Sequence, residues 1–182
     1  PITIEGETYN TADSTPAPYQ RVSVLIQKGP FRRTLNTFSL GDARFSATFQ
    51  PLPTEAGVYT IGAGHPLANL VADQDQFALY GFRPNPEELN LRAVPNEPLS
   101  GQIQLRNLGE LDLTQLQATA LDTPEDVSVQ LSVPSTLPGS TNVTLEYTVT
   151  TTRTPHARCT FDLNVATDEG VSVEIPVKLE IV

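Results

Sequence analysis

The side chains of this sequence that can do acid-base or nucleophilic chemistry are few and far apart. A catalytic histidine needs a nucleophile to activate or a carboxylate to orient it. His65 and His156 lie in different halves of the chain, each beside a proline, so both are expected in solvated loops. Cys159 is the only cysteine, which excludes an intramolecular disulfide and a cysteine-based zinc cluster. It shares a strand face with Phe161 and Leu163, so we predict a buried and unreactive thiol.

The carboxylates form two short acidic clusters. Asp73 and Asp75 are two residues apart, a spacing at which alternate positions of a turn can converge on one calcium ion. Their segment, Val71–Gln76, lacks the glycine and the distal glutamate of an EF-hand loop. Solvation of a loop is the favoured interpretation, and a weak calcium site stays open as the alternative. The second acidic cluster, interpreted in the same way, consists of Asp122, Glu125 and Asp126.

Motifs of the common enzyme classes do not occur in the sequence. There is no Gly-x-Ser-x-Gly elbow, no Gly-x-x-x-x-Gly-Lys phosphate loop and no His-Glu-x-x-His zinc helix. Asn142 to Thr144 matches a glycosylation sequon, but a three-residue motif arises readily by chance. We therefore assign no catalytic, cofactor-binding or metal-ligating residue, and we predict a protein that is not an enzyme and uses no cofactor.

Tyrosines provide the one pattern that favours ligand binding. Exposed tyrosines beside acids can stack on a sugar and donate hydrogen bonds to it. Packing of the same rings inside a β-sandwich is the favoured interpretation, since aromatic residues are enriched in strands. The basic doublet, Arg32 and Arg33, is expected as an exposed hairpin pair. The tyrosines of the first half are Tyr9, Tyr19, Tyr59 and Tyr80.

Charge limits the classes of partner. The 182 residues include 11 Lys and Arg against 21 Asp and Glu, which gives a net charge of −10. A surface that binds phosphates needs clustered cations, so nucleic acid and anionic membrane surfaces are not expected as partners. No apolar run approaches the roughly 18 residues of a membrane helix, so membrane insertion is not expected. The sequence contains no methionine, and we expect it to be a segment of a larger exported protein.

Alternation of apolar and polar residues with period two dominates and predicts strands. In the first half, Ala43–Phe49 places its alanines and phenylalanines on one face. The leucines of 108–121 hint at a helix, but Gly109 and β-branched threonines favour a hairpin. Arg83–Glu88, with two prolines, predicts a stiff solvated connector, although a loop within one large sandwich is the alternative. The predicted strands are 21–27, 31–38, 43–49, 58–63 and 76–82, then 89–94, 101–107, 114–121, 127–133, 141–151, 157–166 and 171–182.

Two parts of the chain resemble known modules. The stretch 99–118, followed by 127–133 and the Ser/Thr-rich 140–150, resembles bacterial immunoglobulin-like or fibronectin-III-like modules with an Asn-x-Gly turn. In that turn Asn107 is expected to bond its own backbone and Gly109 to take a positive φ. The first half, with 22–26, 44–49 and Glu55–Tyr59, is similar to prealbumin-like or macroglobulin-like surface modules. There Gly57 is expected to turn the chain into a strand whose tyrosine packs by its ring. Neither resemblance carries a catalytic residue.

These observations predict an all-β fold of two tandem immunoglobulin-like β-sandwiches. Residues 1–83 are expected to form the first sandwich, 84–88 the connector and 89–182 a seven-stranded second sandwich. The expected function is a non-catalytic structural or interaction module of a larger exported or cell-surface protein, located outside the cell, at its surface or in the periplasm. Its partners would be other domains of the parent protein or a separate protein. The alternative is a carbohydrate-binding accessory module of a polysaccharide-active enzyme.

Overall fold

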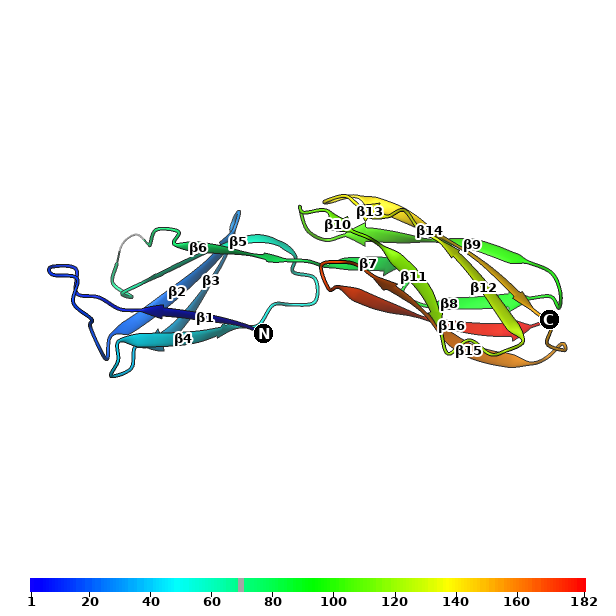
Figure 1. The fold of residues 1–182 in the computed structure, drawn as a ribbon, viewed down its shortest axis with the longest axis horizontal. Helices are drawn as coiled ribbons and strands as arrows, with labels where there is room; N and C mark the ends of the chain where they lie inside the picture. The colour runs from blue at the N-terminus through cyan, green and yellow to red at the C-terminus, as the bar shows by residue number, and fades with distance from the viewer. Residues whose placement is uncertain (69–70) are drawn as a thin grey trace. The chain divides into compact units, whose positions relative to one another are not determined.

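A computed structural model describes residues 1–68 and 71–182, and within these ranges every regular element is a β-strand (Figure 1). This confirms the predicted all-β sandwich architecture. The chain divides into two compact units, Pro1–Leu79 and Tyr80–Val182, here called unit 1 and unit 2. None of the described residues belongs to a helix long and apolar enough to cross a membrane.

Within residues 1–68 and 71–79, unit 1 contains six strands in two sheets. Its larger sheet has the order β3-β2-β5-β6, and a second sheet consists of β1 paired antiparallel with β4. The sequence predicted β2 to β6 but missed β1, although isoleucines alternate with polar residues at its start. The strands of unit 1 are β1 (Ile2–Glu7), β2 (Arg21–Lys28), β3 (Phe31–Phe38), β4 (Arg44–Phe49), β5 (Gly57–Gly64) and β6 (Asp75–Leu79).

The core of unit 1 is built from inward residues of both sheets. Along β4 and the residue before it, the side chains at positions 43, 45, 47 and 49 are buried, as the alternation predicted. Gly57 has a φ of 120°, a conformation that favours glycine, and leads into β5. The ring of Tyr59 then stacks on Phe77 with centroids 5.4 Å apart, which confirms its predicted packing. Phe49 contacts both rings, at 6.1 Å and 5.8 Å between centroids.

Side chains of β3 close one side of unit 1. The hydroxyl of Thr37 donates to the carbonyl of Ser46 at 3.0 Å, and Arg33 donates to the carbonyl of Gln50 at 3.0 Å. Arg33 also pairs with Glu55 at 2.7 Å and lies 5.0 Å from the ring centroid of Phe49. The prediction of an exposed arginine pair was therefore wrong for Arg33, whose guanidinium covers the aromatic core.

Unit 2 is a sandwich of two four-stranded sheets with an additional short pair. The sheets have the orders β11-β15-β16-β8 and β12-β14-β9-β7, and β10 pairs with β13. All pairings are antiparallel except that of β8 with β16. All seven predicted strands occur, although 114–121 is divided between β10 and β11, and β7 and β13 are additional. The strands are β7 (Phe82–Asn85), β8 (Leu89–Ala93), β9 (Leu99–Asn107), β10 (Leu113–Thr114), β11 (Gln117–Leu121), β12 (Val127–Ser132), β13 (Thr136–Leu137), β14 (Asn142–Thr151), β15 (Arg158–Ala166) and β16 (Ser172–Ile181).

The Asn-x-Gly turn after β9 is anchored by a buried side chain. The Oδ1 atom of Asn107 accepts a hydrogen bond from the Gly109 amide at 2.9 Å, as predicted. Its Nδ2 group donates to the carbonyls of Leu111 at 2.8 Å and Leu137 at 3.0 Å. Gly109 is not among the residues with positive φ, so that part of the prediction was wrong. The asparagine therefore joins the turn to β13, a strand about 30 residues further along.

The boundary between the units differs from the predicted connector at 84–88. The division falls between Leu79 and Tyr80, and Pro84 belongs to β7, where it pairs with Leu105. Strand β7 is the edge of its sheet, and an edge strand tolerates a proline that donates no hydrogen bond to a neighbour. The prolines that suggested a linker instead mark a sheet edge. Whether each unit folds independently stays a prediction.

Candidate functional site

A groove of about 830 Å³ opens in unit 1 beside β1. It is lined by β1, by the segment that follows it, by the start of β2 and by residues of β5 and β6. The apolar part of the lining is Ile4, Val22, Phe45, Ile61 and Ala63. Its lining also includes the polar residues Glu5, Glu7, Tyr9, His65, Gln74 and Asp75.

At Gly6 no side chain separates the backbone of β1 from the ring of Phe45. A Cβ atom at this position would lie 2.5 Å from Cζ of Phe45, its partner across the β1 and β4 ladder. Glycine therefore lets the phenylalanine ring lie against the backbone of β1. Because Phe45 is buried and also lines the groove, the ring connects the groove to the core of unit 1.

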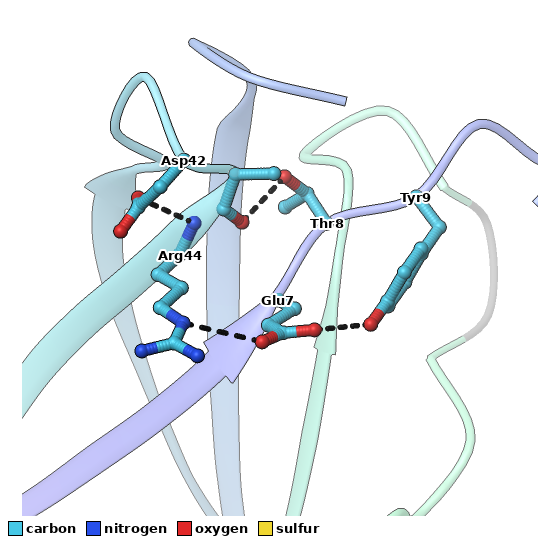
Figure 2. Close-up of polar contacts among 6 residues, drawn as sticks. Glu7, Thr8, Tyr9, Asp42 and Arg44 are labelled. Carbon is cyan, nitrogen blue, oxygen red and sulfur yellow. Dashed lines mark hydrogen bonds and ion pairs between the residues drawn. The ribbon is translucent and has the colours of Figure 1, made fainter. Parts of the chain in front are cut away.

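Glu7 is the centre of a polar network at the end of β1 (Figure 2). Its Oε1 atom accepts a hydrogen bond from Nε of Arg44 at 3.2 Å, and its Oε2 atom accepts one from the hydroxyl of Tyr9. The tyrosine hydroxyl, followed by the Arg44 side chain, lowers the pKa of Glu7 below its ordinary value. The same carboxylate raises the pKa of Tyr9. Glu7 therefore stays ionised at neutral pH and orients an exposed aromatic ring beside the groove.

The backbone next to this network is fixed by Thr8 and Asp42. The hydroxyl of Thr8 donates to the carbonyl of Ala43 at 3.0 Å, and the Thr8 amide donates to the same carbonyl at 2.9 Å. Asp42 accepts a bond from the amide of Arg44 at 3.1 Å (Figure 2). Ala43 has a φ of 66°, an uncommon conformation for a residue with a Cβ atom. These bonds hold the loop before β4 against the end of β1.

Three of the four tyrosines singled out in the sequence are exposed, contrary to the favoured prediction of packing. Tyr9, Tyr19 and Tyr80 are 53%, 76% and 40% exposed, and only Tyr59 is buried. Tyr9 and Tyr19 belong to unit 1, where Phe38 and Leu40 are also largely exposed. Tyr80 belongs to unit 2. Loops that follow β1 and β3 therefore carry aromatic and apolar side chains into solvent.

His65 and Asp75 both line the groove of unit 1, whereas His156 and the second acidic cluster belong to unit 2. His65 is exposed in unit 1, where its Nδ1 atom accepts a bond from the Leu67 amide at 3.2 Å, and His156 is exposed in unit 2. Asp73 accepts a bond from the Thr60 hydroxyl at 3.1 Å. Among residues 1–68 and 71–182, no three His, Cys, Asp or Glu side chains are grouped to hold a metal ion.

The second acidic turn and the sequon have local structural surroundings. Asp126 pairs with Nε of Arg153 at 2.7 Å, and this bond raises the pKa of Arg153. Asp122 has a φ of 54° and Glu125 is exposed, as expected for a solvated turn. Asn142 is exposed at the start of β14. The acidic turn thus anchors the segment after β14.

A second hollow, of about 590 Å³, lies along β8, β16 and β15 of unit 2. Glu180 pairs with Arg92 at 3.0 Å and with Arg158 at 2.8 Å, while Lys178 pairs with Glu88 at 2.9 Å. Hydrogen bonds from these cations lower the pKa values of Glu180 and Glu88. Since each of the three cations faces a carboxylate, the hollow is an ion-paired strand surface and offers no free positive charge to an anion.

Cys159 is half-buried, which corrects the prediction of a fully buried thiol. It packs against the core of unit 2 from β15, and this burial raises the pKa of the thiol. Only a small fraction is therefore thiolate at neutral pH. We expect a maleimide reagent at pH 7 to label the native chain at least about tenfold more slowly than the chain in guanidinium chloride. Equal rates in the two conditions would contradict this.

Comparisons with known proteins give a fold likeness only. No protein-family model matches the chain, and no curated protein sequence matches it. Similar solved structures include the secreted serine protease VesC from Vibrio cholerae, 12% identical with a TM-score of 0.41, over 56% of this chain and 23% of that one. Domains 4 and 5 of the S-layer protein SbsC are 12% identical with a TM-score of 0.37, over 69% of this chain and 66% of that one.

A third similar structure is the sialic acid binding region of a Streptococcus sanguinis SK1 adhesin. It is 8% identical with a TM-score of 0.38, over 68% of this chain and 35% of that one. The chain spans less than two thirds of the length of each of these three structures. Likenesses at this level carry no conclusion about the ligands or activity of the chain.

Proposed function

We propose that this chain is a non-catalytic interaction module of a larger exported or cell-surface protein, and that unit 1 carries its contact surface. The observation that supports this most is the groove beside β1, which reaches the core residue Phe45 and is flanked by the exposed ring of Tyr9. Exposed tyrosines next to apolar grooves are typical of protein contact surfaces. A location outside the cell, at its surface or in the periplasm belongs to the same proposal and rests on analogy of fold class alone.

The carboxyl groups whose pKa is shifted belong to ion pairs and hydrogen-bonded turns. A carboxyl group can act as a general acid at neutral pH when its pKa is raised, commonly by burial. Among the described carboxyl groups with a shifted pKa, each is shifted downward by hydrogen bonds or by neighbouring cations. Ion pairs and turns account for these shifts. The chain's partners would be a protein or other domains of its parent.

Carbohydrate binding is the second candidate, favoured by the exposure of Tyr9 and Tyr19 in unit 1. A tyrosine ring can stack on the face of a sugar, while neighbouring carboxylates accept hydrogen bonds from the hydroxyl groups of the sugar. The Glu7 carboxylate already accepts a hydrogen bond from the Tyr9 hydroxyl, which holds the ring in one orientation. This candidate would use the same surface with a different ligand.

Photo-crosslinking tests the proposed function. With benzoylphenylalanine at Tyr9, irradiation with surface extract of the source cells is expected to give a discrete protein adduct that excess unmodified chain suppresses. The matched control carries the same photoreactive residue at Val182, which is 50% exposed in unit 2, and should not give this adduct. Equal labelling at both positions would contradict the proposal.

A glycan array with the same chain separates the two candidates. The proposed function predicts no glycan whose binding depends on unit 1. Reproducible binding that Tyr9→Ala and Tyr19→Ala both abolish would replace the interaction role with carbohydrate binding. Turnover of chromogenic glycoside, ester or peptide substrates by the purified chain would overturn the non-catalytic assignment.

A further inference from the structure

Strand β1 has one hydrogen-bonded side and one open side. Among the residues that the structure describes it pairs only with β4, from Ile2 opposite Phe49 to Glu7 opposite Arg44. Beyond the strand, the Thr8 amide donates to the Ala43 carbonyl, which continues this ladder by one residue. Hydrogen-bonded and non-hydrogen-bonded pairs alternate along an antiparallel ladder. The backbone N–H and C=O groups of residues 3, 5 and 7 therefore point away from β4.

The open side of β1 is the side with the groove. Glu5, Gly6 and Glu7 line it from β1, while Ile61 and Ala63 line it from β5. Both β5 residues pack on the core of unit 1 yet are only half-buried. The opposite side of the sandwich is closed by bonds from β3 to β4, whereas here the core is partly exposed along a strand edge. A further strand beside β1 would cover these apolar side chains.

Strand β1 lacks three of the usual protections of an edge, although it carries glutamates. Lysine, proline or a bulge commonly prevents an edge from pairing with another strand. The sequence of β1, ITIEGE, contains neither lysine nor proline, and its register with β4 is continuous over six residues. Its backbone groups therefore repeat at about 6.8 Å, twice the rise per residue, which matches another extended peptide.

The charges beside this edge are mainly acidic. Glu5 and Asp75 line the groove, and within residues 1–68 and 71–182 neither makes an ion pair. Glu7 is also ionised, while Arg21 is the single arginine among the described lining residues. Side chains directly across a strand pair interact most strongly, and like charges there are destabilising. A second copy of β1 would oppose glutamates to glutamates, whereas lysine or arginine would be favoured.

We propose that the open edge of β1 binds an extended peptide segment in which apolar and basic residues alternate. This rests on the proposed interaction role and specifies its ligand. The peptide backbone pairs with residues 3, 5 and 7 of β1, as in other cases of strand addition. Its apolar side chains enter the groove toward Ile61 and Ala63, and its basic side chains lie beside Glu5 and Glu7 on the outer face.

The full chain and synthetic peptides of about eight residues test this inference. The probe alternates valine with lysine, and the controls are a peptide of the same composition with its lysines clustered and a peptide that alternates valine with glutamate. We expect the probe to bind at least about tenfold more tightly than either control in fluorescence anisotropy. Binding should weaken when salt is raised from about 50 mM to about 300 mM, since exposed charges are screened. Equal binding of the clustered-lysine control would overturn the proposal.

Amide hydrogen exchange locates the bound peptide. Saturation with the probe should slow exchange at Thr3, Glu5 and Glu7 at least about tenfold and leave Ile4, which faces β4, nearly unchanged. Protection at another strand edge, or protection by an added glycan instead of the peptide, would contradict the assignment. Association of the chain with itself through β1, seen as concentration-dependent protection without peptide, would also contradict it.

Two substitutions of Glu5 separate the contribution of its backbone N–H to probe binding from the contribution of its carboxylate charge. Glu5→Pro removes an N–H that points away from β4 and should weaken probe binding at least about tenfold while unit 1 stays folded. Glu5→Gln keeps that N–H and should weaken binding about threefold at low salt. Glu174→Gln, at an exposed strand glutamate of unit 2, is the matched control and should have no effect. Unchanged binding in Glu5→Gln together with unchanged exchange at residues 3, 5 and 7 would overturn the proposal even if the proline variant fails to fold.

Discussion

Replacing Phe49 with alanine is expected to unfold unit 1 while unit 2 stays folded. Phe49 is fully buried and contacts Tyr59, Phe77 and the guanidinium of Arg33. Truncation of a buried phenylalanine costs about 3 to 5 kcal/mol, because transfer energy is lost and a cavity remains. A domain the size of unit 1 has a free energy of unfolding on the order of 4 to 12 kcal/mol, so this loss is a large part of it. The chemical-shift dispersion of the unit 1 amides should collapse at 25 °C, or unit 1 should melt at a much lower temperature than in the unchanged chain.

Phe38→Ala is the matched control for this prediction. Phe38 is the same residue type in the same unit, but it is 61% exposed. Its truncation should change the free energy of unfolding by less than about 1 kcal/mol.

The Phe49→Ala variant also tests whether the two units fold independently. If Phe49→Ala collapses the dispersion of the amide resonances of both units together, the two form one cooperative system and the prediction of separately folded sandwiches fails.

The strands could be predicted because period two is a local property of the sequence. In Ala43–Phe49 the alternation of apolar and polar residues was enough to identify the buried face. The short polar side chain of Asn107 was enough to predict the turn that follows β9. The predicted connector at 84–88 differs from the observed division between the units because proline is common both in linkers and at the edges of sheets. At Pro84 the missing N–H suits either a linker or the edge of a sheet, and only the pairing of β7 with β9 distinguishes them.

The groove could not be predicted because its geometry depends on contacts between distant residues. Glu7 and Arg44, which meet at the end of β1, are separated by 37 positions in the sequence. Which side of β1 is open follows from its pairing with β4, and no local pattern encodes that choice. The isoleucines at positions 2 and 4 were a usable signal for β1 itself. The partial burial of Arg33 could not be predicted for the same reason, because it depends on Glu55 and on the ring of Phe49, which are distant in the sequence.

Replacing Asn107 with alanine is expected to lower the melting temperature of unit 2 by about 12 to 24 °C. The buried amide bonds the Gly109 amide and the carbonyls of Leu111 and Leu137, so truncation leaves three backbone groups without this partner. We expect a loss of about 3 kcal/mol, given that each unsatisfied buried group costs about 1 to 3 kcal/mol and part of that is recovered by water. For a domain of roughly 100 residues, each kcal/mol shifts the melting temperature by about 4 to 8 °C. Calorimetry of the full chain measures this.

Two further variants show how the Asn107 side chain acts. Asn107→Asp keeps an acceptor for the Gly109 amide but places an ionised carboxylate against two carbonyl oxygens, so above pH 5 or so it should be at least as unstable as the alanine variant. Asn142→Ala removes an exposed asparagine of the same unit and should shift the melting temperature by less than about 3 °C. Because Asn107 bonds the carbonyl of Leu137, its loss should also speed amide exchange in β10 and β13 before the rest of unit 2. If Asn107→Ala melts within about 3 °C of the unchanged chain, the turn is held by the backbone pairing of β9 and β14 and the asparagine is dispensable.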